Sequence, residues 1–351
     1  MSPAPGVPAR LSDLVAPGRH LALVGTTASG KSALALALAR RDPLVELISV
    51  DSMQVYREMD IGTAKPTEVE QEEVRHHLID VVDPDDDYTV ARFAHDVRVV
   101  LRDLEARGRR GILIGGTGLY ARAAVDDFEI PAQYPAVRAE LEQETDTAAL
   151  HERLAALDPV AASRMEPTNR RRVVRALEVT LGGGRPFSSY GPGLTAYPPS
   201  PITMVGVRLP RPVIDARIAQ RYDDQLRAGF LDEVRRLAAR PRGLSRTARQ
   251  ALGYRELLRH VEEGVPLADA LELAVTRTRR FARRQERWFR RDPRISWLDP
   301  PPGAGGDQAA LLDALEARFR AGATAATGTD VAPATPGATE PGLNDAVDLP
   351  D

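Results

Sequence analysis

The stretch HLALVGTTASGKSALALALARR, residues 20–41, decides the fold of this chain. Residues 20–24, HLALV, form a short and mostly apolar run that predicts a buried strand, and the residues from Lys31 onward predict a helix. The loop between them, GTTASGKS at residues 25–32, matches the pattern G-x-x-x-x-G-K-[ST]. Because the match follows a strand and opens a helix, the sequence predicts a loop that holds a di- or triphosphate.

The residue types of this loop suit phosphate binding. Backbone N–H groups converge on phosphate oxygens at the positive end of the helix dipole, Lys31 neutralises charge, and Ser32 can ligate Mg²⁺, the cofactor we expect. The ligand is expected to contact Gly25, Thr26, Thr27, Ala28, Ser29, Gly30, Lys31 and Ser32. ATP, GTP and diphosphate leaving groups all fit such a loop. GTP is disfavoured, because the only lysines are Lys31 and Lys65 and neither lies in the Asn-Lys-x-Asp motif that reads guanine.

Strands and helices alternate through the first part of the chain. Further strands are predicted at residues 45–50, 76–82, 111–116 and 202–209, with a short one in ISWLD at residues 295–299. This alternation predicts an α/β fold with a doubly wound parallel sheet that contains the phosphate-binding loop, a helical insertion domain and C-terminal helices. The core is expected at residues 19–124 and 200–300, and the insertion at residues 125–199.

The two ends of the chain are expected to be disordered, at residues 1–18 and 301–351. The last 31 residues, 321–351, are rich in Ala, Gly, Pro and Thr and carry five acids and no base. Without these five acids the formal net charge changes from −3 to +2 for residues 1–320.

Composition narrows the chemistry and the location. The chain has no cysteine, so thiolate nucleophiles, disulfides and cysteine-ligated metals are excluded. No run of eighteen apolar residues and no secretory signal is present, and we expect a cytoplasmic protein without membrane contact.

Arginine is concentrated in RTRRFARRQERWFRRDPR, residues 277–294, which holds nine arginines against Glu286 and Asp292. A charge run is commonly a solvated helix face. Here Phe281, Trp288 and Phe289 are interleaved with the arginines, a composition that favours contact with nucleic acid.

Asp51 follows the predicted strand at residues 45–50. Doubly wound sheets bind ligands beside the carboxyl ends of their strands, so this carboxylate is expected next to the phosphate-binding loop. It could act as a general base. Its position equally allows a helix N-cap or an indirect partner of Mg²⁺.

Seven segments in order resemble the tRNA dimethylallyltransferase family: GTTASGKS, DSMQVYREMDIGTAKP, HHLIDVVDP, GGTGLY, NRRRVVRALEV, QALGYRE and ARRQERWFRR. The resemblance spans roughly residues 20–299. It implies that the loop holds dimethylallyl diphosphate and that the prenyl group passes to the exocyclic amine of the adenosine 3′ of the tRNA anticodon. Asp51 would be the base, Lys31 would stabilise the leaving diphosphate, and Arg221 would contact it, with Arg217 one helical turn away as a rival.

The resemblance also implies the tRNA contacts. They fall on Asp51, Ser52, Met53, Gln54, Thr117, Arg171, Arg172, Arg175, Gln250, Gly253, Tyr254, Arg283, Arg284, Gln285, Arg287 and Arg290, so the helical insertion is expected to touch tRNA. The partner is the anticodon stem-loop, and the protein is expected to be a monomer. Thr26 replaces the usual proline, Ser32 the usual threonine, and Arg249 an apolar residue.

The sequence features are also compatible with other functions. A nucleotide or small-molecule kinase would use the same loop for ATP, but it does not need the arginine-rich segment. A non-catalytic RNA-binding protein would keep its tRNA affinity without Asp51. A prenyltransferase acting on free adenine nucleotides would not need the helical insertion.

Overall fold

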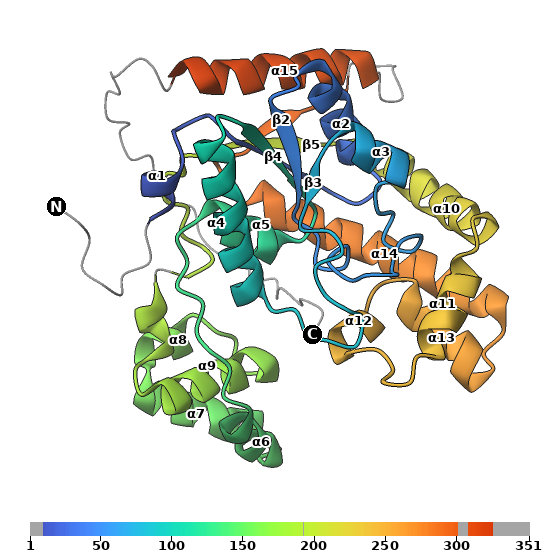
Figure 1. The fold of residues 1–351 in the computed structure, drawn as a ribbon. Helices are drawn as coiled ribbons and strands as arrows, with labels where there is room; N and C mark the ends of the chain where they lie inside the picture. The colour runs from blue at the N-terminus through green and yellow to red at the C-terminus, as the bar shows by residue number, and fades with distance from the viewer. Residues whose placement is uncertain (1–9, 192, 301–307, 326–351) are drawn as a thin grey trace. The chain divides into compact units, whose positions relative to one another are not determined.

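The computed structural model describes residues 10–191, 193–300 and 308–325 (Figure 1). Within these ranges the chain forms two compact units: residues 127–198 make one, and the residues before and after them make the other. Each unit has its own buried core.

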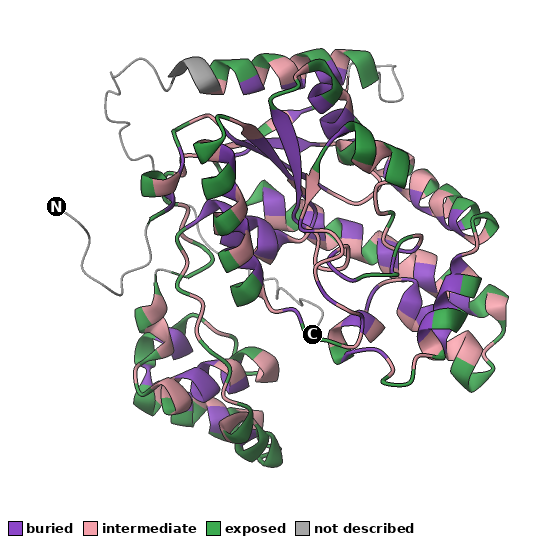
Figure 2. Ribbon diagram, in the orientation of Figure 1, coloured by how far each residue is buried: buried purple, intermediate pink, exposed green. Residues whose placement is uncertain are grey.

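The larger unit is built on a parallel sheet. In the described part of the chain its strands are β1 (Leu21–Gly25), β2 (Val45–Ser49), β3 (His76–His77), β4 (Arg110–Gly115), β5 (Thr203–Val207) and β6 (Ser296–Leu298). They lie in the order β3-β2-β4-β1-β5-β6, and every pair is parallel. All five residues of β1 and of β2 are buried, as expected for strands covered on both faces (Figure 2). The predicted α/β fold with a doubly wound parallel sheet is confirmed.

Two helices cover one face of the sheet, α2 (Lys31–Arg41) and α15 (Gln308–Ala325). Leu34 and Leu38 of α2 share a core with Leu315 and Phe319 of α15 and with alternate strand residues such as Leu23. Helices α4 (Val90–Ala106) and α5 (Gly118–Val125) pack against the sheet as well. The side chains of α4 that point inward, Phe93, Val97, Leu101 and Leu104, recur at helical spacing and are all buried.

Both disordered ends were predicted too long. Residues 308–325 form α15, because Leu311, Leu315 and Phe319 supply an apolar stripe that buries against the sheet. Near the start, α1 (Leu11–Leu14) is ordered, and Leu11 and Val15 are buried. The rest of both predicted segments, residues 1–9, 301–307 and 326–351, lies outside the described residues.

The remaining helices of this unit are α3 (Glu68–Glu73), α10 (Arg211–Arg227), α11 (Phe230–Ala238), α12 (Arg246–Arg249), α13 (Tyr254–Glu263) and α14 (Leu267–Arg290). Helix α14 packs on α10, α13, α5 and β1, so it links the helices after β5 to the sheet (Figure 1). Among the described residues, no helix is long and apolar enough to cross a membrane.

The smaller unit is helical. It contains α6 (Pro135–Gln143), α7 (Thr147–Leu157), α8 (Pro159–Ser163), α9 (Arg170–Gly183) and the 3₁₀ helix η1 (Phe187–Tyr190). Leu141, Leu150, Leu154 and Leu177 form its buried centre. Its contact with tRNA stays a prediction.

Candidate active site

The phosphate-binding loop joins β1 to α2, and its shape depends on glycine. Gly30 caps α2 with φ of 86°, a conformation that L side chains rarely adopt. A Cβ on Gly25 would lie 2.8 Å from the carbonyl oxygen of Val207. Ala28 also has a positive φ, 61°, which costs about 1 kcal/mol or more in a residue with a side chain. Backbone strain of this kind is typical of ligand-binding loops.

Lys31 is turned inward over the loop. Its Nζ donates to the carbonyl oxygen of Thr26 at 3.1 Å. Burial lowers the pKa of Lys31 to about 8; the carboxylate of Asp51 counters this shift and the guanidinium of Arg221 adds to it. Two of the groups predicted to be catalytic, Asp51 and Arg221, therefore both influence the charge of the third, Lys31. The hydroxyl of Ser29 is buried and has no hydrogen-bond partner among the described residues.

Two arginines of α10 reach the loop. Arg221 donates from Nη1 to the Thr27 hydroxyl at 3.0 Å and from Nη2 to the carbonyl oxygen of Gly62 at 3.3 Å. Arg217 approaches the carbonyl oxygen of Ala28 at 3.5 Å, the limit for a hydrogen bond. Arg221 makes the stronger contacts, but which arginine touches the ligand stays a prediction.

Asp51 lies two residues after the end of β2, and Val50 between them donates its N–H to the Ile114 carbonyl of β4 at 2.7 Å. Its Oδ1 accepts the N–H of Met53 at 2.8 Å. This bond closes a turn, and no helix begins at Asp51, so the alternative of a helix N-cap is wrong. Gln54, also predicted to contact tRNA, uses its side chain inside the protein: it accepts from Ser49 and donates to the Thr63 and Ala64 carbonyls.

Comparison with known proteins identifies the family. The IPP transferase family model matches residues 54–292, which is more than half of the chain. The chain belongs to the IPP transferase family.

Curated relatives of this IPP transferase carry one name. The tRNA dimethylallyltransferase of Nocardioides sp. is 47% identical over 281 residues, covering 79% of this chain and 90% of the relative. That of Thermobifida fusca is 48% identical over 286 residues, covering 79% and 89%. These relatives make the chain a prenyltransferase, a class whose donors carry a diphosphate.

Solved structures agree with the family assignment. The tRNA isopentenylpyrophosphate transferase of Bacillus halodurans has a TM-score of 0.62 at 33% identity and covers 88% of this chain and 99% of its own. A eukaryotic dimethylallyltransferase described as acting on tRNA has a TM-score of 0.68 at 26% identity, with 83% and 76% covered.

A second turn of the IPP transferase, residues 60–65, supports Arg221 because its Gly62 carbonyl oxygen accepts a hydrogen bond from the guanidinium. The buried carboxylate of Glu233 accepts the backbone N–H groups of Asp60, Ile61 and Gly62 at 3.1, 2.8 and 3.2 Å. Gln225 donates to the Ile61 and Gly62 carbonyls at 2.6 and 3.1 Å. The sequence did not single out Glu233 and Gln225 as site residues. Both lie in helices that otherwise expose many charged side chains, so their residue type alone does not mark them as buried.

The predicted tRNA residues on α13 and before it differ in exposure. Gln250 is half-buried, and Gly253 caps α13 with φ of 86°. Tyr254 is buried, and its hydroxyl donates to Glu233. Burial raises the pKa of Tyr254 well above its usual value, and Glu233 adds to the shift. Tyr254 therefore holds the turn at residues 60–65 from within the protein.

Toward its C-terminal end, helix α14 exposes three arginines and buries Gln285. Arg283, Arg287 and Arg290 are exposed, and Arg290 pairs with Glu286 at 2.5 Å. The guanidinium of Arg284 lies 5.7 Å from the Phe281 ring centre. Gln285 is 6% exposed.

Thr117 and Ser52 complete the predicted tRNA set of the larger unit. Thr117 precedes α5 at the end of β4, and its half-buried side chain does not cap the helix. Ser52 is half-buried beside Asp51. Three arginines, Arg171, Arg172 and Arg175, belong to α9 of the smaller unit, where Arg175 pairs with Glu178 at 2.8 Å.

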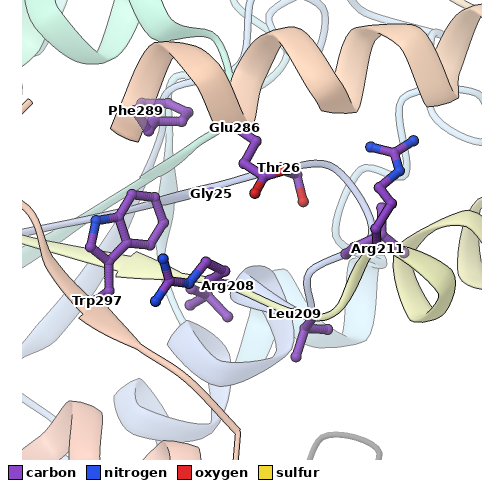
Figure 3. A pocket seen from close by; sticks show the side chains of 10 residues that line it. Gly25, Thr26, Arg208, Leu209, Arg211, Glu286, Phe289 and Trp297 are labelled. Carbon is purple, nitrogen blue, oxygen red and sulfur yellow. The ribbon is translucent and has the colours of Figure 1, made fainter. Parts of the chain in front are cut away.

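A pocket lies on the β5 side of the phosphate-binding loop (Figure 3). Gly25 and Thr26 form part of its wall, with Phe289 and Trp297 on the apolar side. Its charged residues are already paired within the protein: Arg208 with Asp299 at 2.7 Å and Arg211 with Asp215 at 2.5 Å.

Proposed function

We propose that this IPP transferase moves a dimethylallyl group from dimethylallyl diphosphate to the N6 amine of the adenosine 3′-adjacent to the anticodon of tRNA, releasing diphosphate. Family membership supports the reaction type. The observation that carries the proposal is the arrangement of Lys31 and Arg221 at the phosphate-binding loop, with the Asp51 carboxylate near enough to raise the pKa of Lys31 against the effect of burial.

The proposed step is a displacement at the allylic carbon. The N6 lone pair forms the new carbon–nitrogen bond while the bond from carbon to the diphosphate oxygen breaks, and its electron pair leaves with diphosphate. Asp51 accepts the proton released from N6. Its Oδ1 is already held by the Met53 N–H, which fixes the carboxylate in place.

Charge builds on diphosphate as the bond breaks, so cations fixed around it stabilise the transition state more than the ground state. Lys31 would exchange the Thr26 carbonyl for a phosphate oxygen, and Arg221 or Arg217 would bind another. Because Lys31 is desolvated, its charge acts more strongly there than it would in water.

The chemistry of the loop fits Mg²⁺. The exposed hydroxyl of Ser32 at the first turn of α2 is the oxygen ligand this motif supplies. Mg²⁺ is usually bound through one or two protein oxygens, substrate phosphates and water. When bound, the ion would neutralise charge on the diphosphate.

The anticodon stem-loop is the proposed partner, and the exposed arginines of α14 are its proposed phosphate contacts. The target adenosine must leave its stack to reach Asp51, which costs little in a single-stranded loop. Thr117 and Gln250 are proposed to contact it. We also propose that the protein is a monomer and that it acts in the cytoplasm, where tRNA is available.

Replacing the base tests the proposal. Asp51→Ala should lower turnover by roughly 10²- to 10⁴-fold with tRNA affinity largely unchanged. The assay is mass spectrometry of anticodon-loop nucleosides after incubation of unmodified tRNA with dimethylallyl diphosphate. Asp51→Asn, which keeps an oxygen for the Met53 N–H, is the matched control and should be equally slow. Turnover at the wild-type rate in either variant would remove the base assignment, and phosphoryl transfer from ATP would favour the kinase.

A further inference from the structure

Gln285 connects two loops that lie far from it in the sequence. Its Oε1 accepts the backbone N–H of Thr27 at 2.9 Å, and its Nε2 donates to the carbonyl oxygen of Gly116 at 2.8 Å. An N–H needs an acceptor and a carbonyl needs a donor, so only one orientation of the amide satisfies both loops. The side chain is buried on the inner face of α14.

The fit at Gly116 is close. A Cβ on this residue would lie 2.4 Å from Nε2 of Gln285 and 3.1 Å from the carbonyl oxygen of Gly25. Any side chain there would displace the amide, because a Cβ does not approach a heavy atom so closely. The glycine leaves space for the amide of Gln285 between the two loops.

The peptide unit between Thr26 and Thr27 is held on both sides. Its carbonyl oxygen accepts from Lys31 at 3.1 Å, and its N–H donates to Gln285. When Lys31 turns to a phosphate, Gln285 remains to hold this peptide. Because the Thr27 N–H donates to Gln285, this N–H contributes to the shape of the loop.

The other end of the amide reaches the strand end that carries the acceptor side of the site. Gly116 follows β4 and precedes Thr117, and β4 pairs with β2 at Ile114 and Ser49, just before Asp51. One side chain thus ties the donor loop to the strand that positions the base.

From this geometry we infer that Gln285 is a positioning residue, which sets the phosphate-binding loop relative to the end of β4 and so aligns donor and base. The consequence of this role for catalysis rests on the proposed function. A tRNA contact through the amide, as the resemblance implies, would instead leave the donor loop unaffected by its removal.

Two neighbouring residues of α14 separate these roles. Gln285→Met keeps the volume but removes both hydrogen bonds, and Arg283→Met removes an exposed charge two residues away. Binding of inorganic diphosphate is measured by calorimetry, and tRNA binding by filter retention. We expect Gln285→Met to weaken diphosphate binding about tenfold or more, since a buried carbonyl and a half-buried N–H lose their partners, with tRNA affinity changed less than twofold. Arg283→Met should weaken tRNA binding and leave diphosphate binding unchanged.

A second variant guards against misfolding of the first. Gln285→Glu retains an acceptor for Thr27, but its ionised form turns a second oxygen toward the Gly116 carbonyl. Protonation restores a donor there, and burial raises the pKa of such a carboxyl. The ratio of its diphosphate affinity to that of the wild type should therefore rise at least fivefold from pH 8 to pH 6. Both variants are checked by thermal unfolding.

The outcomes are distinct. Weakened tRNA binding with unchanged diphosphate binding in Gln285→Met overturns the inference in favour of a tRNA contact, and a ratio independent of pH in Gln285→Glu overturns it too. If the wild type binds diphosphate but does not prenylate tRNA, the proposed function fails, while the effect of Gln285 on the loop is still measured.

Discussion

The chain has two lysines, and the two loops that contain them use the charge in opposite ways. Lys65, in the turn at residues 60–65, is 2% exposed and pairs with Asp60 at 2.5 Å and Asp80 at 2.6 Å. It also donates to the Tyr56 carbonyl at 2.9 Å. Lys31, in the phosphate-binding loop, donates only to a neutral carbonyl, and among the described residues no carboxylate lies within ion-pair distance of it.

This difference separates a structural charge from one kept for a ligand. Two carboxylates neutralise Lys65, which ties its loop to the segment carrying Asp80. Desolvation without a paired carboxylate lowers the pKa of Lys31, and an incoming diphosphate would relieve that cost. The sequence shows that the chain has no other lysine, but only the surroundings of each residue distinguish their roles.

In the comparison of the two lysines, the largest expected effect is that of replacing Lys31. Lys31→Met should lower kcat/KM for dimethylallyl diphosphate by about 10²- to 10³-fold, because one fixed cation is lost from the developing diphosphate charge. The free energy of unfolding should change little, since an unpaired desolvated charge is removed. Steady-state kinetics and urea unfolding measure the two quantities. A donor kcat/KM near that of the wild type would contradict a ligand role for this lysine.

Lys65→Met should reverse the pattern. The variant leaves Asp60, Asp80 and the Tyr56 carbonyl without their shared donor, which should lower the free energy of unfolding by roughly 2 to 3 kcal/mol. Both carboxylates are partly exposed and can be rehydrated, which limits the loss. Diphosphate affinity of the folded variant should stay within about twofold of wild type. If it falls as in Lys31→Met, the two lysines do not differ as described.

Glu233→Gln probes the turn that Lys65 and Arg221 share. The carboxylate accepts three backbone N–H groups and the Tyr254 hydroxyl, and an amide nitrogen can accept none of them. We expect a loss of about 1 to 2 kcal/mol in unfolding free energy, with a several-fold rise in donor KM because Arg221 rests on Gly62. Tyr254→Phe, which removes one hydroxyl, is the milder control. Full stability in Glu233→Gln would show that these hydrogen bonds are not needed to hold the turn at residues 60–65.

A smaller effect than that of Lys31→Met is expected in the pH dependence of donor binding. Lys31, with a pKa of about 8, is charged below that pH and neutral above it, and diphosphate binds the charged form. Diphosphate affinity should therefore fall above pH 8, by at most about tenfold per pH unit. Dividing by the affinity of Lys31→Met removes the titration of the ligand itself. A ratio that is flat from pH 7 to pH 9.5 would mean that Lys31 does not titrate in this range.

Short-range patterns predicted the sheet well. Each predicted strand appears in the structure, because apolar runs bounded by turns bury in a covered parallel sheet. The third is the exception in length: β3 has only two residues, His76 and His77, of the run predicted at residues 76–82. Helix α15 was missed because the composition of the tail masked the apolar stripe of Leu311, Leu315 and Phe319.

The sequence by itself determined the phosphate-binding loop and its setting, since a strand, a glycine loop and a helix are specified by neighbouring residues. Only the tertiary structure decided which side chains support that loop. Arg221 meets Thr27 across 194 positions and Gln285 meets it across 258. Such contacts depend on how α14 packs against β1 and how α10 packs on α14, and no local periodicity encodes that packing.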